Sequence, residues 1–258
     1  MERRIEGQRL AYYKKTADAV YWDNHWHDQD AAKIYQWAEK GELFQFEEPF
    51  ITYLPKRGRI LEAGCGLGQM VMALRIRGYD CEGVEWAAQT VTKTHQLYPD
   101  LPIWIGDVTR LAKPTGHYKG YISLGVVEHR QAGPEPFLRE AYRVLTDDGA
   151  LLLSVPHLHS LRRYKASWGL YQGRTEDRSF YQYAFTPEEM GKILASEGFK
   201  VIDLFGLGGY KGFKDEVPGL RDIVRWRLVG GTLRVSLRHW KWFNQTFGHM
   251  MMFVCRKL

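Results

Sequence analysis

The chain has 258 residues, of which 45% are hydrophobic, and it carries a formal net charge of +6. This length accommodates one α/β domain with additions. No stretch approaches the roughly 20 apolar residues that span a bilayer, and the first residues lack the apolar run of a secretion signal, so we expect a soluble, cytoplasmic protein. Residues 209–258 hold ten basic and three acidic residues, so the positive charge is local and does not indicate nucleic-acid binding.

The sequence divides into four regions, residues 1–58, 59–206, 207–247 and 248–258. Residues 1–58 are rich in Tyr and Trp and are expected to form a helical cap or lid. Between residues 59 and 206, strand and helix patterns alternate, which predicts a doubly wound, mostly parallel α/β core. The expected strands cover 59–63, 80–85, 103–106, 118–124, 149–155 and 199–205, with a last core strand within 248–258.

Two segments interrupt this alternation. Residues 157–185 form a long, basic and aromatic connection, which in a compact domain is usually functional or a lid. Residues 207–247 form a basic and aromatic insertion. It could contact anionic lipid weakly through an amphipathic surface, but we favour a pair of helices that cap the edge of the sheet.

A glycine-rich turn follows the first core strand, in the run Arg59-Ile-Leu-Glu-Ala-Gly-Cys-Gly-Leu-Gly-Gln69. Its three glycines, Gly64, Gly66 and Gly68, alternate along the chain. Glycine lacks a Cβ and tolerates positive φ, so the backbone of such a turn can contact a bound nucleoside. A phosphate-binding dinucleotide turn would place its third glycine at position 69 instead.

Acidic residues follow the next two strands. Glu85, before Trp86, ends the second strand, and its carboxylate can accept both ribose hydroxyls, as acids in NAD sites also do. Asp107, before Val108, follows the third strand, where a carboxylate can accept from the amine of adenine. In a parallel sheet these strand ends meet at one edge, so we expect an adenosine site there.

This series of features resembles the class I S-adenosylmethionine (SAM) methyltransferases, in particular their ubiquinone-biosynthesis-like and small-molecule O-methyltransferase branch. The resemblance covers about residues 59–205, with further likeness at 180–189 and 249–257. It implies a Rossmann-like, seven-stranded sheet in the order 3-2-1-4-5-7-6, with only the seventh strand antiparallel. The cofactor-binding residues that it implies are Glu62, Gly64, Cys65, Gly66 and Gly68 for the methionine part and the turn, Glu85 for the ribose, Asp107 for adenine, Trp86 and Val108 around the ring, and Leu124 and Gly125 beneath the sulfonium.

Aromatic residues near the N-terminus resemble cover segments of related methyltransferases. Trp22 and Trp26 could close over the cationic sulfonium, which favours aromatic faces, or form one apolar helix stripe in the core. Tyr12 and Tyr13 leave the same two interpretations open, with a slight preference for the cover. The remaining candidates for substrate or lid contacts are His157, Tyr171 and Tyr181.

Catalysis at the acceptor would use a base if the acceptor is a hydroxyl. His129 lies just past the fourth strand and is the candidate base, although it could instead bond backbone at a helix entry. Glu128 is expected to orient its neighbourhood. His157 and His159 invite a metal interpretation, but without a nearby acid we expect exposed loop histidines and no metal.

The sequence therefore predicts a SAM-dependent methyltransferase of a small-molecule acceptor, most favourably at a hydroxyl, in secondary-metabolite, quinone or glycan biosynthesis. Its product would be S-adenosylhomocysteine, and no nucleic-acid partner is expected. An N-methyltransferase of a small amine and a catalytically silent SAM-binding scaffold or regulator are the alternatives.

Overall fold

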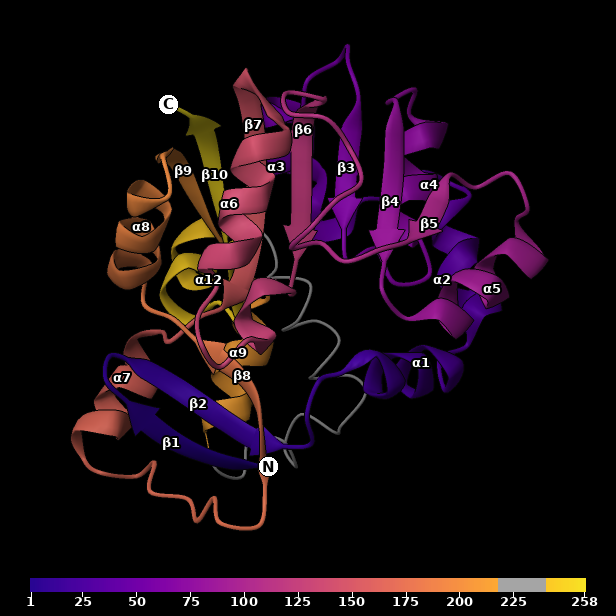
Figure 1. Cartoon of the computed structure of the whole chain (residues 1–258). Coiled ribbons are helices and arrows are strands. Elements are labelled where there is room, and N and C mark those ends of the chain that lie inside the picture. The colour runs from indigo at the N-terminus through magenta and orange to yellow at the C-terminus, as the bar shows by residue number, and fades with distance from the viewer. Residues whose placement is uncertain (218–239) are drawn as a thin grey trace.

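The computed structural model describes residues 1–217 and 240–258, which build two β-sheets with surrounding helices (Figure 1). The larger sheet has seven strands in the order β5-β4-β3-β6-β7-β10-β9, or 3-2-1-4-5-7-6 when they are numbered within the sheet. Neighbours pair in parallel except at β10, which is antiparallel to both β7 and β9. The strands are β3 (Ile60–Ala63), β4 (Cys81–Glu85), β5 (Ile103–Ile105), β6 (Tyr118–Leu124), β7 (Leu145–Pro156), β9 (Phe199–Leu207) and β10 (Met250–Lys257).

Helices cover both faces of this sheet, so most residues of its central strands are buried. On one face, Leu138 of α6 and Leu194 of α8 join a buried cluster, and on the other, Phe50 of α3 and Leu74 of α4 join a second one. A strand buried on both faces needs a continuous apolar run. The helices are α1 (Ala19–His27), α2 (Ala31–Ala38), α3 (Glu47–Tyr53), α4 (Gln69–Ile76), α5 (Ala88–Leu97), α6 (Glu135–Val144), α7 (Ser160–Ser167), α8 (Pro187–Ser196), α9 (Gly209–Glu216) and α12 (Lys241–Phe247), with 3-10 turns η1 (Phe44–Phe46) and η2 (Val127–His129).

A second, three-stranded antiparallel sheet stands beside the first. It contains β1 (Glu2–Glu6), β2 (Arg9–Lys14) and β8 (Ser179–Ala184), with β2 in the middle. The prediction of a helical cap over residues 1–58 is therefore wrong for the first fourteen residues. Only two residues separate β1 from β2, and the first, Gly7, has φ +59°, as tight hairpins require. The partner strand β8 lies far away in sequence, so a local pattern cannot reveal this sheet.

The two interrupting segments also contain regular structure. The connection at 157–185 includes α7 and β8, and the insertion at 207–247 begins with α9 and ends with α12. Residues 218–239, which carry five of the eight basic residues of the insertion at 207–247, lie outside the described residues, together with much of the surface considered for lipid contact. Among residues 1–217 and 240–258, no helix is long and apolar enough to cross a membrane.

The carboxyl ends of the parallel strands share one edge of the large sheet. In Figure 1 the arrows of β4 and β6 point toward α1 and α9, so these elements lie over that edge. In doubly wound sheets, ligands bind in the crevice outside the carboxyl ends. The expected site residues therefore fall on the functional edge of the fold.

Candidate active site

The glycine turn after β3 adopts backbone conformations that favour glycine. Gly64, Gly66 and Gly68 have φ values of +77°, +55° and +70°. A Cβ on Gly66 would lie 2.4 Å from a ring carbon of Trp26, and one on Gly64 would lie 2.5 Å from Val126. The turn therefore depends on glycine both for its φ angles and for the close approach of neighbouring groups.

Glu85, at the end of β4, ties the glycine turn to the neighbouring strand. One carboxylate oxygen accepts the Gly66 amide at 2.9 Å, and the other accepts the amides of Trp86 at 2.9 Å and Ala87 at 3.1 Å. Burial raises the pKa of Glu85, and these backbone donors oppose that effect. A carboxylate offers about four lone pairs, so Glu85 retains capacity for a ligand hydroxyl.

Glu62, in β3, has a buried carboxyl with a free oxygen. Its Oε2 is buried and has no hydrogen-bond partner in residues 1–217 and 240–258, and burial raises the pKa of Glu62 to about 8. An unpaired buried carboxylate is unfavourable, so this group suits a ligand that brings its own positive charge or hydrogen-bond donor.

The remaining cofactor candidates lie on the same edge with different exposure. Asp107 is exposed, and its Oδ1 accepts the Thr109 amide at 2.8 Å and the Thr109 hydroxyl at 2.7 Å. Trp86 is 47% exposed, whereas Val108 and Cys65 are buried. Since β3, β4 and β5 are neighbours, the edge presents Glu62, Glu85 and Asp107 side by side.

Helix α1 covers this edge with aromatic rings. Trp26 lies against Gly66, and the Trp22 ring is 5.2 Å from the ring of His129. Both tryptophans are partly buried, and α1 contains no fully buried residue. This arrangement is compatible with the cover interpretation, although Trp26 also packs beside the second core cluster.

A carboxylate that the sequence analysis missed holds α1 in place. Asp23 accepts the Thr90 amide at 2.9 Å and its hydroxyl at 3.0 Å. Thr90 is the third residue of α5, where amides lack helical partners, so Asp23 caps this helix from another one. Lys93 adds a bond to the Trp26 carbonyl at 3.1 Å. The 67-residue separation hides this cap from any local pattern.

The expected base, His129, is bonded to backbone and remains neutral. Its Nδ1 lies 2.7 Å from the Tyr181 carbonyl oxygen, so Nδ1 carries the proton and donates, and Nε2 keeps its lone pair. Burial lowers the pKa of His129 to about 4. The Tyr181 ring also packs 4.9 Å from the imidazole, which places Tyr181 at the site.

Glu128 lies between His129 and the floor of the site. Its Oε1 is 3.9 Å from His129 Nε2 and 3.4 Å from the position of a Cβ on Gly125. Its Oε2 is buried and finds no hydrogen-bond partner in the part of the chain that the structure describes, and burial raises the pKa of Glu128 to about 8. The end of β6 therefore presents an imidazole nitrogen and a carboxyl to the same small region.

Two of the tyrosine candidates, Tyr12 and Tyr13, lie in β2 of the small sheet, and Tyr171 packs against that sheet. Tyr12 and Tyr171 are buried together with Leu158 on one side. Tyr13 lies on the other side, packs edge-on against Phe180 and donates to the Glu6 carboxylate. These tyrosines form a wall beyond the carboxyl ends of the strands, separate from the aromatic rings of α1.

The prediction of exposed loop histidines at 157 and 159 is wrong. His157 is 6% exposed and His159 is fully buried, because α7 and α12 pack over the end of β7, with the Phe247 ring 6.2 Å from His159. His249 precedes β10 and joins them. Within the described residues, no group of three or more His, Cys, Asp or Glu side chains is arranged to hold a metal ion.

The fold and its glycine-turn edge are those of a class I, Rossmann-like methyltransferase. A family model described as a methyltransferase domain matches residues 26–204, which is more than half of the chain. The chain therefore belongs to this family of SAM-dependent methyltransferases. The comparisons support neither the ubiquinone-like branch nor any other branch in particular.

Curated relatives agree with this family. A protein named as a probable S-adenosylmethionine-dependent methyltransferase of Mycolicibacterium smegmatis is 27% identical over 174 residues, which are 66% of this chain and 64% of that protein. Two Mycobacterium tuberculosis proteins with the same kind of name are 25% identical over 165 residues. The chain spans 54% to 64% of the length of these relatives.

Solved structures share the fold at low sequence identity. A 1,6-didemethyltoxoflavin-N1-methyltransferase of Burkholderia thailandensis, with its substrate and S-adenosylhomocysteine bound, superposes with a TM-score of 0.57 and 13% identity, covering 100% of this chain and 99% of that one. A TehB-like SAM-dependent methyltransferase of Corynebacterium glutamicum gives a TM-score of 0.55 and 16% identity, covering 93% and 100%. At these identities the likeness concerns the fold.

Proposed function

We propose that this chain transfers the methyl group of SAM to a hydroxyl of a small-molecule acceptor. The observation that carries the proposal is the state of His129: its Nδ1 proton is committed to the Tyr181 carbonyl, which leaves Nε2 as a proton acceptor beside the end of β6. The acceptor would belong to one of the pathways expected from the sequence: secondary-metabolite, quinone or glycan biosynthesis.

The residues around the glycine turn fit SAM. Glu62 would receive the amino group of the methionine part of SAM, because its Oε2 is buried without a partner among the described residues. Glu85 would accept one ribose hydroxyl with its remaining lone pair, and Asp107 would accept from the adenine amine. When bound, SAM supplies an electrophilic methyl group on a sulfonium. Because Trp26 lies against Gly66, α1 would cover the cofactor on the side of the glycine turn.

His129 would act on the acceptor hydroxyl. Its pKa of about 4 makes it neutral near pH 7, so Nε2 can accept a hydrogen bond from the hydroxyl in the ground state. Methylation of a neutral hydroxyl oxygen makes that oxygen strongly acidic, so even a weakly basic imidazole can take its proton. The protein's other contribution is alignment in a water-poor pocket.

A second candidate, N-methylation of a small amine, is favoured by one feature. The buried Glu128 carboxyl has a free oxygen and lies close to Gly125, where it could pair with an ammonium or amine. In that case Glu128 would bind the acceptor and His129 would be dispensable. The N1-methyltransferase fold of the Burkholderia enzyme is compatible with this alternative.

The deciding experiment measures release of S-adenosylhomocysteine across matched hydroxyl and amine acceptors. Hydroxyl turnover that falls in His129→Ala but persists in Glu128→Gln supports the proposal. Amine turnover that depends on Glu128 supports the second candidate. Clear SAM binding by calorimetry without turnover of any acceptor would instead support a silent scaffold.

A further inference from the structure

The carboxyl end of β7, the amino end of β10 and the start of α9 hold several buried polar atoms. Within residues 1–217 and 240–258, both ring nitrogens of His159, the Nδ1 atoms of His157 and His249, and the Tyr210 hydroxyl are buried and make no hydrogen bond. A buried polar group without a hydrogen bond is costly. The rings of His157 and His159 are 5.9 Å apart, and His249 also lies close to His159. Neighbouring side chains with this defect are difficult to explain as packing alone, so they suggest a ligand that would satisfy them.

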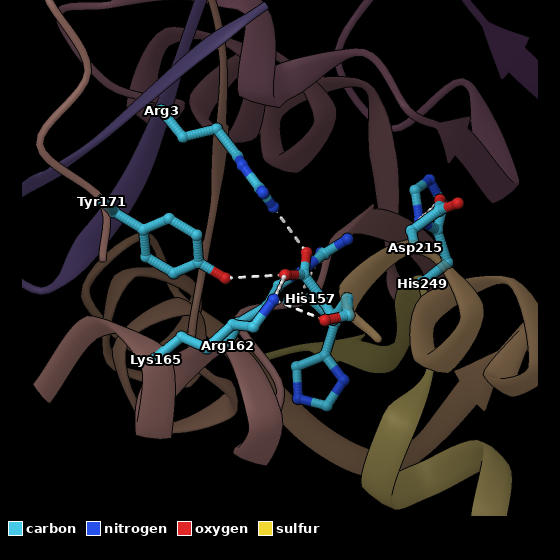
Figure 2. Close-up of polar contacts among 8 residues, drawn as sticks. Arg3, His157, Arg162, Lys165, Tyr171, Asp215 and His249 are labelled. Carbon is cyan, nitrogen blue, oxygen red and sulfur yellow. Dashed lines mark hydrogen bonds and ion pairs between the residues drawn. The ribbon is translucent and has the colours of Figure 1, made fainter. Parts of the chain in front are cut away.

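The surroundings of these atoms carry excess positive charge. The Glu216 carboxylate forms ion pairs with Arg3 at 2.6 Å, Arg162 at 3.1 Å and Lys165 at 3.0 Å. It also accepts a hydrogen bond from the Tyr171 hydroxyl at 2.9 Å. Figure 2 shows Arg3, Tyr171 and Lys165 converging from different elements. One carboxylate therefore faces three cationic side chains.

This charge pattern is reflected in the titration of the groups. Burial alone would raise the pKa of Glu216, but Arg3 and the bond from Lys165 lower it to about 2. Burial, with Arg162 and Lys211 nearby, keeps His249 uncharged, and its partner at 3.9 Å is Asp215. With Lys211 and Asp215 included, the cluster contains four basic side chains and two acidic ones, Glu216 and Asp215. The pair of Arg163 and Glu188 lies further out, 4.0 Å apart, and adds no net charge.

The cluster lies within reach of the methyl-transfer region. A Cβ on Gly125 would be 3.7 Å from the Met250 side chain, and the preceding residue, His249, accepts the His157 amide at 3.1 Å. From β6 to β10 the sheet spans two strand spacings, about 10 Å. A small metabolite can bridge that distance, with its nucleophile at Gly125 and its other end at the histidines.

We propose that His157, His159, His249 and Tyr210, with Arg162 and Lys211, bind an oxyanion group of the acceptor, a carboxylate or a phosphate. This inference rests on the proposed methyl transfer, because it assigns the far end of the same acceptor. A neutral imidazole carries one N–H, so His159 and His249 would each donate one hydrogen bond to the oxyanion, and the phenol would donate a third. His157, which hydrogen-bonds the Gly248 backbone, would line the site without donating, and the surplus cations would balance the charge of the oxyanion. Arg162 also donates to the His157 carbonyl at 2.8 Å, which fixes it beside the histidines.

The test compares the full chain with His159→Phe, which keeps a ring of similar size but removes both unpartnered nitrogens. Thermal melting is followed with sodium phosphate, sodium acetate or sodium chloride at equal ionic strength, and S-adenosylhomocysteine affinity is measured separately by calorimetry. His249→Phe serves as a second variant. His117→Phe, ahead of β6 at the opposite edge of the sheet, serves as the matched control.

We expect phosphate or acetate to raise the melting temperature of the wild type by several degrees more than chloride. His159→Phe should melt higher than the wild type without oxyanions, lose the specific rise and keep its S-adenosylhomocysteine affinity. A rise with phosphate alone would assign a phosphorylated acceptor, and a rise with both anions would assign either an acidic or a phosphorylated one.

An oxyanion effect that is absent from the wild type, or unchanged in both phenylalanine variants, would overturn the inference. So would a His159→Phe protein that melts lower and loses cofactor affinity, because that result indicates a structural role. Failure to bind S-adenosylhomocysteine by a wild type that still responds to oxyanions would remove the proposed function and leave the anion site standing.

Discussion

The proposed cofactor site and the proposed acceptor site on this edge are built in different ways. The proposed cofactor site takes Glu62, the glycine turn, Glu85 and Asp107 from three neighbouring strands within about fifty residues of sequence. The charged groups around the proposed acceptor site come from β1 (Arg3), α7 (Arg162) and α9 (Glu216), and Arg3 and Glu216 are 213 residues apart. A nucleoside site can thus be specified locally, whereas the proposed acceptor site forms only when distant segments have met.

The largest expected effect concerns the proposed cofactor site alone. Gly66→Val would place a branched side chain at φ +55° and against the Trp26 ring. We expect S-adenosylhomocysteine affinity to fall by at least about a thousand-fold, or 4 kcal/mol, in calorimetry. Gly78→Ala is the control, since Gly78 also has positive φ but nothing within 4 Å of its Cβ position. Equal losses in both variants would show that strain, not the turn, is responsible.

The second prediction concerns His129, at the end of β6, and distinguishes catalysis from cofactor binding. His129→Ala should lower kcat with hydroxyl acceptors by about 10²–10⁴-fold, the usual contribution of a general base, while cofactor affinity stays nearly unchanged. Steady-state kinetics and calorimetry measure the two effects. His117→Ala should leave both unchanged. Full hydroxyl turnover in His129→Ala would break the assignment of a base without affecting the family.

The third prediction uses the pH dependence of two buried carboxyls. The pKa of Glu62 is about 8 in the folded chain, against about 4.3 when unfolded. Between these values the folded state holds the extra proton, so the free energy of unfolding falls as pH rises, by up to about 1.4 kcal/mol per unit. The melting temperature of Glu62→Gln, measured relative to that of the wild type, should therefore rise between pH 5 and pH 8.

Glu128→Gln provides the matched comparison, because the pKa of Glu128 is also about 8. Both variants should show the same pH trend in stability, but only Glu62→Gln should weaken cofactor binding, by roughly tenfold, as expected for one lost charged hydrogen bond. Parallel melting curves for wild type and variants would mean that neither carboxyl is protonated in the folded chain.

The smallest expected effect concerns the attachment of α1. Asp23→Ala removes the cap on α5 and should cost about 1 kcal/mol of stability, with a several-fold faster release of cofactor if α1 is a cover. Stopped-flow dissociation measures the release. Asp30→Ala, which removes the N-cap residue directly before α2, should cost similar stability without changing the release rate. Equal release rates for both variants would argue against a covering role for α1.

The sequence predicted the core because its signals are local. The apolar runs, the glycine turn and the Thr186 cap of α8, which accepts the Glu189 amide at 3.1 Å, all depend on residues within a few positions. Other features depend on contacts between segments that are far apart in sequence, and such contacts produce no periodic pattern. They are the small sheet, the Asp23 cap and the burial of His159. One available signal was missed: Gly7 and Gln8 have the spacing of a hairpin turn.

The small sheet also bears on how the chain acquires its structure. β1 and β2 obtain their third strand only when β8, more than 160 residues further along the chain, pairs with them, and Arg3 pairs with Glu216, which is 213 residues away. Contacts between residues so far apart in sequence form slowly. In refolding, β1 and β2 should thus be among the last elements to become protected from amide hydrogen exchange, after β3, β4 and β5.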